Sequence, residues 1–143
     1  MVHALEQIHD LLKPEGYLVD IHPNGELVEF LLPLEEGEQF IGHMQETDDY
    51  IEYHQANDAL ESAVTAGLFQ VVETAEFEFL THADSFDELK TFLDENWSDA
   101  VVTDDVMANA RRLERKHGKR KTLLRERVRI GLLKSTRNDS SQP

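Results

Sequence analysis

Residues 11–23 read LLKPEGYLVDIHP and contain the end of one element, a tight turn and the start of the next. Apolar residues in the segment 1–12 recur at helical spacing, which predicts a helix there. The Lys-Pro-Glu-Gly turn at 13–16 ends that helix, because proline cannot continue it. The run 17–21 is apolar except for Asp20, a pattern typical of a strand buried on both faces. Helix, turn and strand make half of a parallel βαβ unit and predict an α/β fold.

The rest of the chain predicts further strands and helices. Asn24-Gly25 is a turn signal, and Ser85 with Glu88 forms a capping box at a helix start. Gly67 and Gly118 are expected to end two helices. In order, the predicted elements are a hairpin at 27–34 and 39–45, a helix at 49–66, a strand at 68–80, a helix at 85–97, a helix from 103 to 118 and a strand at 123–133.

Length and composition indicate one domain. The chain has 143 residues and no cysteine, so it can bury a core but forms no disulfide framework. We expect a single domain over 1–134, followed by a disordered polar tail at 135–143. The N-terminus shows no signal-peptide pattern, and no apolar run is long enough for a membrane span. These features predict a cytoplasmic protein without a membrane partner.

Charge is distributed unevenly along the chain. The net charge is −15, yet residues 111–143 hold 12 Lys and Arg, whereas residues 1–110 hold only Lys13 and Lys90. A basic block can bind the phosphates of nucleic acid, but an acidic body repels them. We therefore favour the alternative that the basic residues pair with acidic neighbours inside the fold.

One such pairing can be specified. If the last strand lies antiparallel to the strand that begins at Phe69, then Arg127 and Arg129 lie near Glu76 and Glu78. Aromatic residues are interleaved with acidic ones, whereas a base-stacking surface needs aromatic and basic side chains together. We expect no nucleic-acid partner and assign these aromatic residues to the core: Trp97 and the phenylalanines at 69, 77, 79, 86 and 92.

The run ALEQIHDLLKPEGYLVDI at residues 4–21 resembles class I S-adenosylmethionine-dependent methyltransferases, in the helix before strand five and strand five itself. Glu15 replaces the usual first glycine of that turn. The later elements follow the family's order, in which an antiparallel seventh strand lies between strands five and six, and residues 129–134 are similar to the ends of many such enzymes. The resemblance implies the C-terminal half of a Rossmann-like sheet (strands five, seven and six), with an extra hairpin and flanking helices.

The resemblance also implies that this chain by itself does not hold the methyl donor. The glycine-rich turn after strand one, the acidic residue after strand two and the strand-four motif have no counterpart here. We therefore expect the C-terminal portion of a methyltransferase, inactive alone, that uses S-adenosylmethionine only when an N-terminal half is supplied. The chain is then a truncated product or half of a split enzyme, and it begins where the first four strands are elsewhere or lost.

Two alternatives stay open. The chain can be a non-catalytic interaction module derived from a methyltransferase, or an unrelated acidic α+β binding protein whose Lys-Pro-Glu-Gly turn is a coincidence. The methyltransferase half and the interaction module both leave strand 17–21 with one neighbour, so its uncovered edge should pair with another strand. We expect a homo-oligomer, or a complementing N-terminal half bound at that edge.

Three residues are candidates for substrate contact. His22 follows strand 17–21 at its C-terminal end, where open α/β sheets place their ligands, and Tyr53 and His54 lie on the next helix. A polar-loop histidine and a core tyrosine are the competing structural interpretations. No catalytic residue is assigned. A metal site is not expected either, because the spacing of the nearby oxygen and nitrogen ligands matches no known site: His43, Glu46, Asp48, Asp49 and His54.

Overall fold

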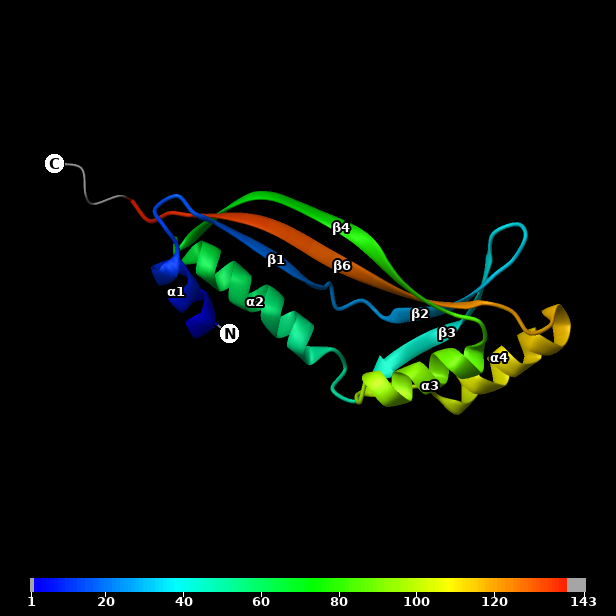
Figure 1. Cartoon of the computed structure of the whole chain (residues 1–143). Helices are drawn as coiled ribbons and strands as arrows, with labels where there is room; N and C mark the ends of the chain where they lie inside the picture. Colours follow the sequence, from blue (N-terminus) through cyan, green and yellow to red (C-terminus); the bar gives the residue numbers. More distant parts are fainter. Residues whose placement is uncertain (1, 139–143) are drawn as a thin grey trace. The chain divides into compact units, whose positions relative to one another are not determined.

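The computed structural model describes residues 2–138, which form four helices and six strands (Figure 1). The helices are α1 (Val2–Leu11), α2 (Ile51–Thr65), α3 (Phe86–Asn96) and α4 (Asp104–His117). The strands are β1 (Tyr17–Pro23), β2 (Val28–Pro33), β3 (Glu38–Glu46), β4 (Phe69–Ala83), β5 (Ala100–Val101) and β6 (Thr122–Ser135). The expected α/β class is confirmed.

These residues divide into two compact units, each described by itself. The first unit takes the described residues up to Gly25, Ile51–Phe77 and the chain from Val128. The second unit takes Glu26–Tyr50 and Glu78–Arg127. Strands β4 and β6 contribute residues to both.

In the first unit, β6 pairs with both β1 and β4. The β1–β6 ladder is antiparallel and places Tyr17 opposite Lys134 and Pro23 opposite Val128. In Figure 1, β6 runs between β4 and β1. The last strand of the chain therefore lies between two strands that precede it in sequence.

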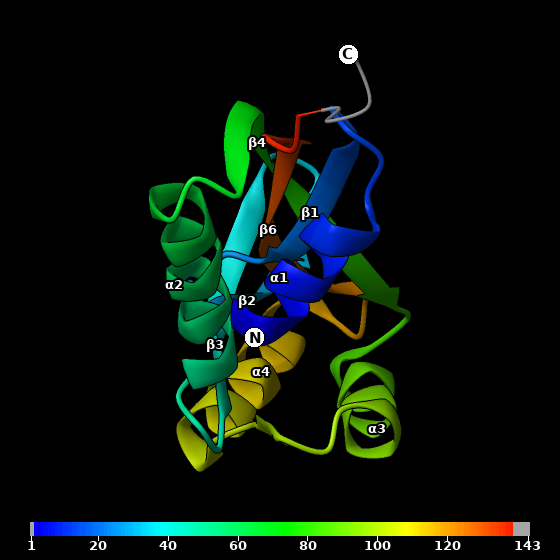
Figure 2. The same ribbon diagram turned by 90° about the vertical axis from the view of Figure 1, so that its left-hand side faces the viewer.

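Helices α1 and α2 cover one face of this small sheet. α1 packs against α2 (Figure 2), and the small side chains Ala59 and Ala63 leave room for Leu5. Phe69 from β4 and Leu133 from β6 complete this core. Of the predicted tail at 135–143, residues 139–143 lie outside the described residues. Thr136, within the tail, donates through Oγ1 to the carbonyl oxygen of Leu68 at 2.9 Å.

Strand β1 is covered on one face only. Leu18 packs against the core, whereas Tyr17, Val19 and Ile21 are each more than half exposed. The prediction of a strand buried on both faces is wrong for this reason. Side chains alternate between the two faces of a strand, and the helices of the first unit cover only one of them.

The second unit contains the predicted hairpin. β2 and β3 pair antiparallel, with a register shift between Phe30 and Leu31. β2 also pairs with the first part of β6, where Glu29 lies opposite Arg125, and the unpredicted two-residue β5 pairs with β3. The core contains fully buried side chains from several elements: Val28, Phe30, Met44 and Leu89.

Local signals set most helix boundaries. Ser85 Oγ accepts a hydrogen bond from the backbone N of Glu88 at 3.2 Å, which confirms the predicted cap of α3. Gly118 follows α4 at a φ of 79°, and Gly67 follows α2 at 76°. α2 begins later than predicted, at Ile51, because Asp49 and its neighbour Tyr50 adopt positive φ.

The predicted ion pairs and aromatic core are only partly observed. Arg127 lies 3.4 Å from Glu26, and the residue of β6 within 4 Å of Glu78 is Arg125, at 3.9 Å. Arg129 and Glu76 line one shallow pocket, so the predicted proximity holds for this pair without an ion pair. Phe69 and Phe86 are buried as expected. Three other phenylalanines predicted in the core are instead 43–54% exposed: Phe77, Phe79 and Phe92. Phe77 and Phe79 are exposed because this part of β4 is exposed on both faces.

Candidate functional site

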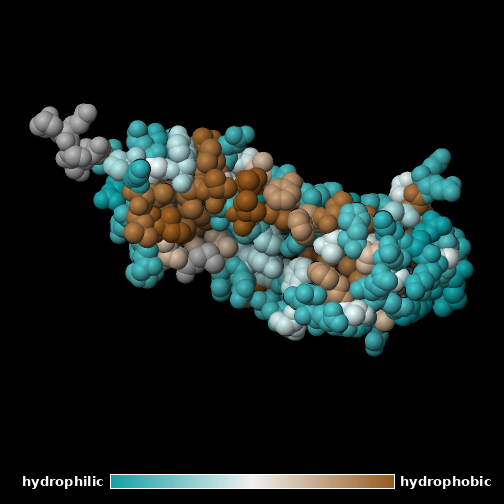
Figure 3. All heavy atoms as spheres, in the orientation of Figure 1, coloured by the Kyte–Doolittle hydropathy of each residue, from teal (hydrophilic) through white to brown (hydrophobic). Residues whose placement is uncertain are grey.

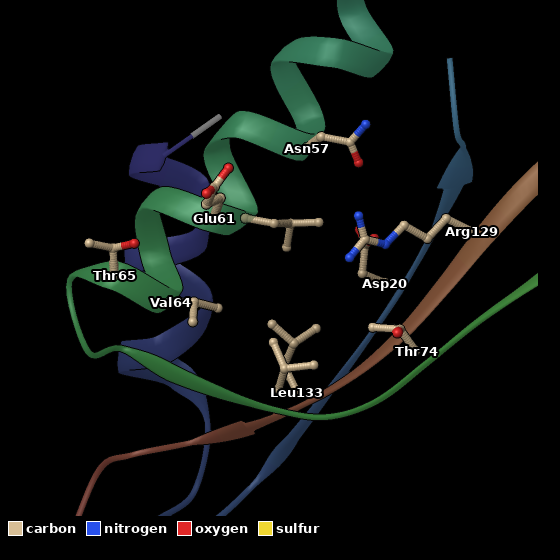
Figure 4. Close-up of a pocket in the computed structure, with 11 residues that line it drawn as sticks. Asp20, Asn57, Glu61, Val64, Thr65, Thr74, Arg129 and Leu133 are labelled. Atoms are coloured by element: carbon tan, nitrogen blue, oxygen red, sulfur yellow. The ribbon is translucent and has the colours of Figure 1, made fainter. Parts of the chain in front are cut away.

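A pocket of about 390 Å³ lies within the first unit, between α2 and the three strands (Figure 4). Its volume is within the range of small-molecule sites. Leu60, Val64 and Leu133 give it an apolar floor. The remaining lining residues are Asp20 from β1, Asn57, Glu61 and Thr65 from α2, Val71 and Thr74 from β4, and Arg129 and Gly131 from β6.

Beside this pocket, His22 is held between β1 and α2. Its Nδ1 lies 2.5 Å from Oδ2 of Asp20, and its Nε2 lies 2.7 Å from Oδ1 of Asn57. Asp20 and His22 are two residues apart on a strand, so they share a face. The His22 side chain is only 10% exposed. The imidazole is therefore oriented from both sides, and it links the end of β1 to α2.

This arrangement bears directly on the predicted role of His22. A carboxylate bound to one imidazole nitrogen is the arrangement that orients a histidine for proton transfer through the other. Here the second nitrogen faces Asn57, so a substrate atom must displace that amide to reach it. Substrate contact by His22 stays a prediction, and the observed role is structural.

The structure places the other two candidates near the same end of β1. His54 lies against the turn after β1, where a Cβ atom on Gly25 would be 2.9 Å from His54 Cε1. Tyr53 is partly buried on α2, one helical turn before Asn57. The three candidates thus lie around one corner of the first unit. The sequence did not indicate Asn57, although its spacing from Tyr53 and His54 places it on the same side of the helix.

Arg129 is the other polar residue of the pocket that the sequence did not indicate as a site residue. It lies directly opposite His22 across the β1–β6 ladder. Within residues 2–138 its side chain makes no hydrogen bond or ion pair, and Glu61 on α2 makes none either. The pocket thus combines an apolar floor with an available cation and an available carboxylate.

The outer edge of β1 is open. Within the described chain, β1 pairs with β6 alone. Ser135 N donates to Gly16 O at 2.8 Å, so these two opposite residues form a hydrogen-bonded pair. Hydrogen-bonded and non-hydrogen-bonded pairs alternate along an antiparallel ladder, so Leu18 exchanges hydrogen bonds with β6 and Val19 does not. The β1 edge, defined here as Tyr17, Val19 and Ile21, therefore points its backbone N–H and C=O groups away from β6.

Both outer strands of the first unit, β1 and β4, expose apolar side chains. All three residues of the β1 edge are more than half exposed, and Val71, Val72 and Phe77 of β4 are 43–51% exposed. Figure 3 shows apolar atoms gathered on the surface of the first unit. Exposed apolar area next to an unpaired strand edge marks an association surface.

The described residues contain no glycine-rich turn of the kind that holds S-adenosylmethionine in a Rossmann-like site. A Rossmann-like site brings a glycine-rich turn between a strand and a helix close to the ligand. In the described residues, Gly25 and Gly37 lie in turns between strands, and Gly67 and Gly118 follow helices. The other three glycines, at 16, 42 and 131, precede or lie within strands, so none opens a helix after a strand.

Other classes of site and the comparisons with known proteins add no identity. Among residues 2–138, no group of three or more His, Asp or Glu is placed to hold a metal ion. None of the described helices is both long and apolar enough to cross a membrane. No protein-family model matches the chain, and no curated protein matches it.

Proposed function

We propose that this chain is the C-terminal half of a class I S-adenosylmethionine-dependent methyltransferase, completed by a methyl-donor-binding half that pairs along the β1 edge. The single observation that carries the proposal is the open edge of β1 beside a fully formed β1–β6 ladder. A strand with unpaired backbone groups and exposed apolar side chains is a template for another strand. In the family that residues 4–21 resemble, strand five has strand four on that side.

The order of strands in the first unit supports the same interpretation. The chain continues from β1 through α2 to β4, and β6 then returns antiparallel to β1. This corresponds to strand five, strand six and a seventh strand between them. The uncovered face of β1 agrees as well, since a complete sheet of this family carries helices on both faces.

The two halves would contribute different parts of the activity. The proposed donor-binding half would supply the glycine-rich turn that binds S-adenosylmethionine, the source of the transferred methyl group. This chain supplies the edge that docks it and, at the C-terminal end of β1, the oriented side chain of His22. Methyl transfer depends on positioning two reactants, so the chain alone is expected to be inactive.

Isothermal titration calorimetry with S-adenosylmethionine tests the proposal. The chain alone should show no binding, and a mixture with the polypeptide encoded immediately upstream should bind the methyl donor. Binding by the chain alone would overturn the assignment of the donor site to the other half. Complex formation without donor binding would instead support the alternative, a non-catalytic interaction module, and failure to form a complex with that polypeptide would contradict the proposal.

A further inference from the structure

The segment RRLERKHGKRK at residues 111–121 holds half of the 14 Lys and Arg residues of the chain. It forms the last turns of α4 and the loop into β6. The sequence favours pairing of these basic residues with acidic neighbours over a contact with nucleic acid. The structure allows this preference to be compared with the partners of each side chain.

The basic residues of helix α4 lie on the side of the helix away from its buried residues. Val106, Ala110 and Leu113 are buried, and Val106 packs closely against Gly42 of β3. Arg111 bonds to Asp87 on α3. By helical spacing, three further basic residues lie near one another on the exposed side, with Arg115 one turn after Arg111 and Lys116 one turn after Arg112, and all three are exposed: Arg112, Arg115 and Lys116.

Beyond the helix, the basic run continues on the surface. Lys119 and Lys121 are exposed, and Arg120 is partly so. Cations in the last turn of a helix are favoured by its dipole, which offers a structural reason for Arg115 and Lys116. That reason does not extend past Gly118 to the three basic residues of the loop. The loop cations therefore need a different explanation.

Five of these cations lack side-chain partners. In the described part of the chain, the following side chains make no hydrogen bond or ion pair: Arg115, Lys116, Lys119, Arg120 and Lys121. Elsewhere in the second unit, Arg111, Arg125 and Arg127 each lie within 4 Å of a carboxylate. Acidic residues outnumber basic ones about two to one in this chain, so partners are plentiful. Among residues 2–138, none of the five lies within 4 Å of a carboxylate; the hydrogen bond from Arg111 lowers the pKa of Asp87, and the charge of Lys119 adds to that effect only from a longer distance. The pairing expected from the sequence holds for four other basic residues of the block: Arg111, Arg125, Arg127 and Lys134.

We propose that residues 112–121, named here the basic patch, bind the phosphodiester backbone of double-stranded nucleic acid without reading its sequence. Double-stranded DNA carries one charge about every 1.7 Å along its axis, so cations that are close together in the sequence can contact several phosphates. The segment 111–121 contains no Phe, Tyr or Trp, so it lacks the large aromatic side chains of a base-stacking surface. The contact is therefore with the backbone, which positions a protein without specifying sequence.

The acidic body of the protein limits the affinity but leaves the contact intact. The chain has a net charge of −15, which repels a polyanion at long range. At physiological ionic strength, screening reduces interactions beyond about 8 Å. The basic patch then acts on phosphates in direct contact, and the distant carboxylates are largely screened. This inference does not depend on the proposed methyltransferase role, because the patch lies in the second unit and the β1 edge in the first.

Fluorescence anisotropy with a labelled 20-base-pair duplex of random sequence, measured between 50 and 200 mM salt, tests the inference. The test variant is Lys116→Gln/Lys119→Gln, which removes two unpaired cations. The matched control is Lys13→Gln/Lys90→Gln, which removes the same charge outside the patch. We expect the test variant to bind at least tenfold more weakly at 50 mM salt, and its salt slope to fall by up to about 1.8, or 0.9 per lost phosphate contact. The control variant has the same net charge as the test variant but loses no phosphate contact. Its affinity for the duplex should therefore stay within about twofold of that of the native chain.

Three results would overturn the inference. The first is no binding of the duplex at 50 mM salt, and the second is an equal loss in test and control variants, which would indicate a net-charge effect. The third is tighter binding of polyglutamate than of the duplex, which would assign the patch to an acidic protein. Far-UV circular dichroism of both variants establishes that they fold. S-adenosylmethionine is absent throughout, so failure here is distinguishable from failure of the proposed function.

Discussion

Gly42 of β3 and Val106 of α4 meet so closely that a Cβ atom on Gly42 would lie 2.6 Å from Cγ2 of Val106. Such a contact is shorter than packed side chains allow, so Gly42→Ala must push α4 away from the hairpin. Overpacking of this kind costs about 1–3 kcal/mol. Urea denaturation should show that loss in the free energy of unfolding.

Two variants make this prediction specific. Val106→Ala removes the clashing methyl groups, so the double variant should recover part of the loss. Gly131→Ala is the matched control, because a Cβ there would meet Leu133 Cδ1 at an ordinary 3.5 Å. Equal destabilisation by the two glycine substitutions would contradict the role assigned to Val106.

The accuracy of the sequence-based fold depended on how local each signal is. Ser85 with Glu88, and the glycines that follow α2 and α4, act within one helical turn, and the helix ends near them were predicted well. Exposure depends on which layers cover a strand. The phenylalanines of β4 and the outer face of β1 were therefore assigned to the core incorrectly, since neither aromatic residues in β4 nor an apolar run in β1 shows that a covering layer is present.

The site was predictable only in part for the same reason. His22 was found because it follows an apolar strand at the end where ligands bind. Its partner Asn57 is 35 residues away in sequence, and an isolated asparagine on a helix carries no signal. Arg129 was assigned to an ion pair, because register between strands cannot be read from charge pattern alone.

The N-cap of α3 should make a measurable contribution to stability. Ser85 is fully buried, and its Oγ accepts from the backbone N of Glu88. Ser85→Ala removes that acceptor and should lower the free energy of unfolding by about 0.5–2 kcal/mol. Ser62→Ala, at an exposed position of α2, is the control and should change it by less than about 0.5 kcal/mol. Similar effects at the two serines, measured by thermal unfolding, would rule out the cap as the cause.

The open β1 edge should cause self-association in the absence of another partner. Val19 points its backbone N–H away from β6, so Val19→Pro removes a group that only an added strand can use. In sedimentation velocity, the native chain should form dimers or larger species, and the variant should sediment mainly as a monomer.

The neighbouring residue provides the control for that experiment. Leu18 exchanges hydrogen bonds with Leu133, so Leu18→Pro should disrupt the β1–β6 ladder and destabilise the first unit. Circular dichroism should therefore distinguish a folded Val19 variant from a damaged Leu18 variant. A native chain that stays monomeric at all concentrations would show that the edge does not recruit a second copy.

Tyr50 should make the protein sensitive to alkaline pH. Burial, assisted by the nearby carboxylate of Glu46, raises the pKa of Tyr50 to about 12, and its hydroxyl donates to Met44 O at 2.6 Å. An unfolded tyrosine ionises near pH 10, so the unfolded state loses its proton first. Stability from this group is complete below about pH 10 and is lost as pH rises through about 12. Urea denaturation between pH 8 and 12 should show this decline, and Tyr50→Phe should weaken it; an unchanged decline would assign it to other groups.

Glu126 should show a pH dependence near the acidic end of the range. Burial raises the pKa of this half-buried carboxyl group above its usual value. The folded state therefore holds this proton more tightly than the unfolded state does. The stability that Glu126 contributes is complete below the pKa of the unfolded state and is lost as pH rises through the pKa of the folded state. Glu126→Gln keeps the shape without the charge, and should raise the free energy of unfolding at pH 7 but have little effect at acidic pH, where the native carboxyl is protonated. Urea denaturation of both proteins at pH 4 and pH 7 measures this difference. A gain of equal size at both pH values would indicate that the removed charge is not its cause.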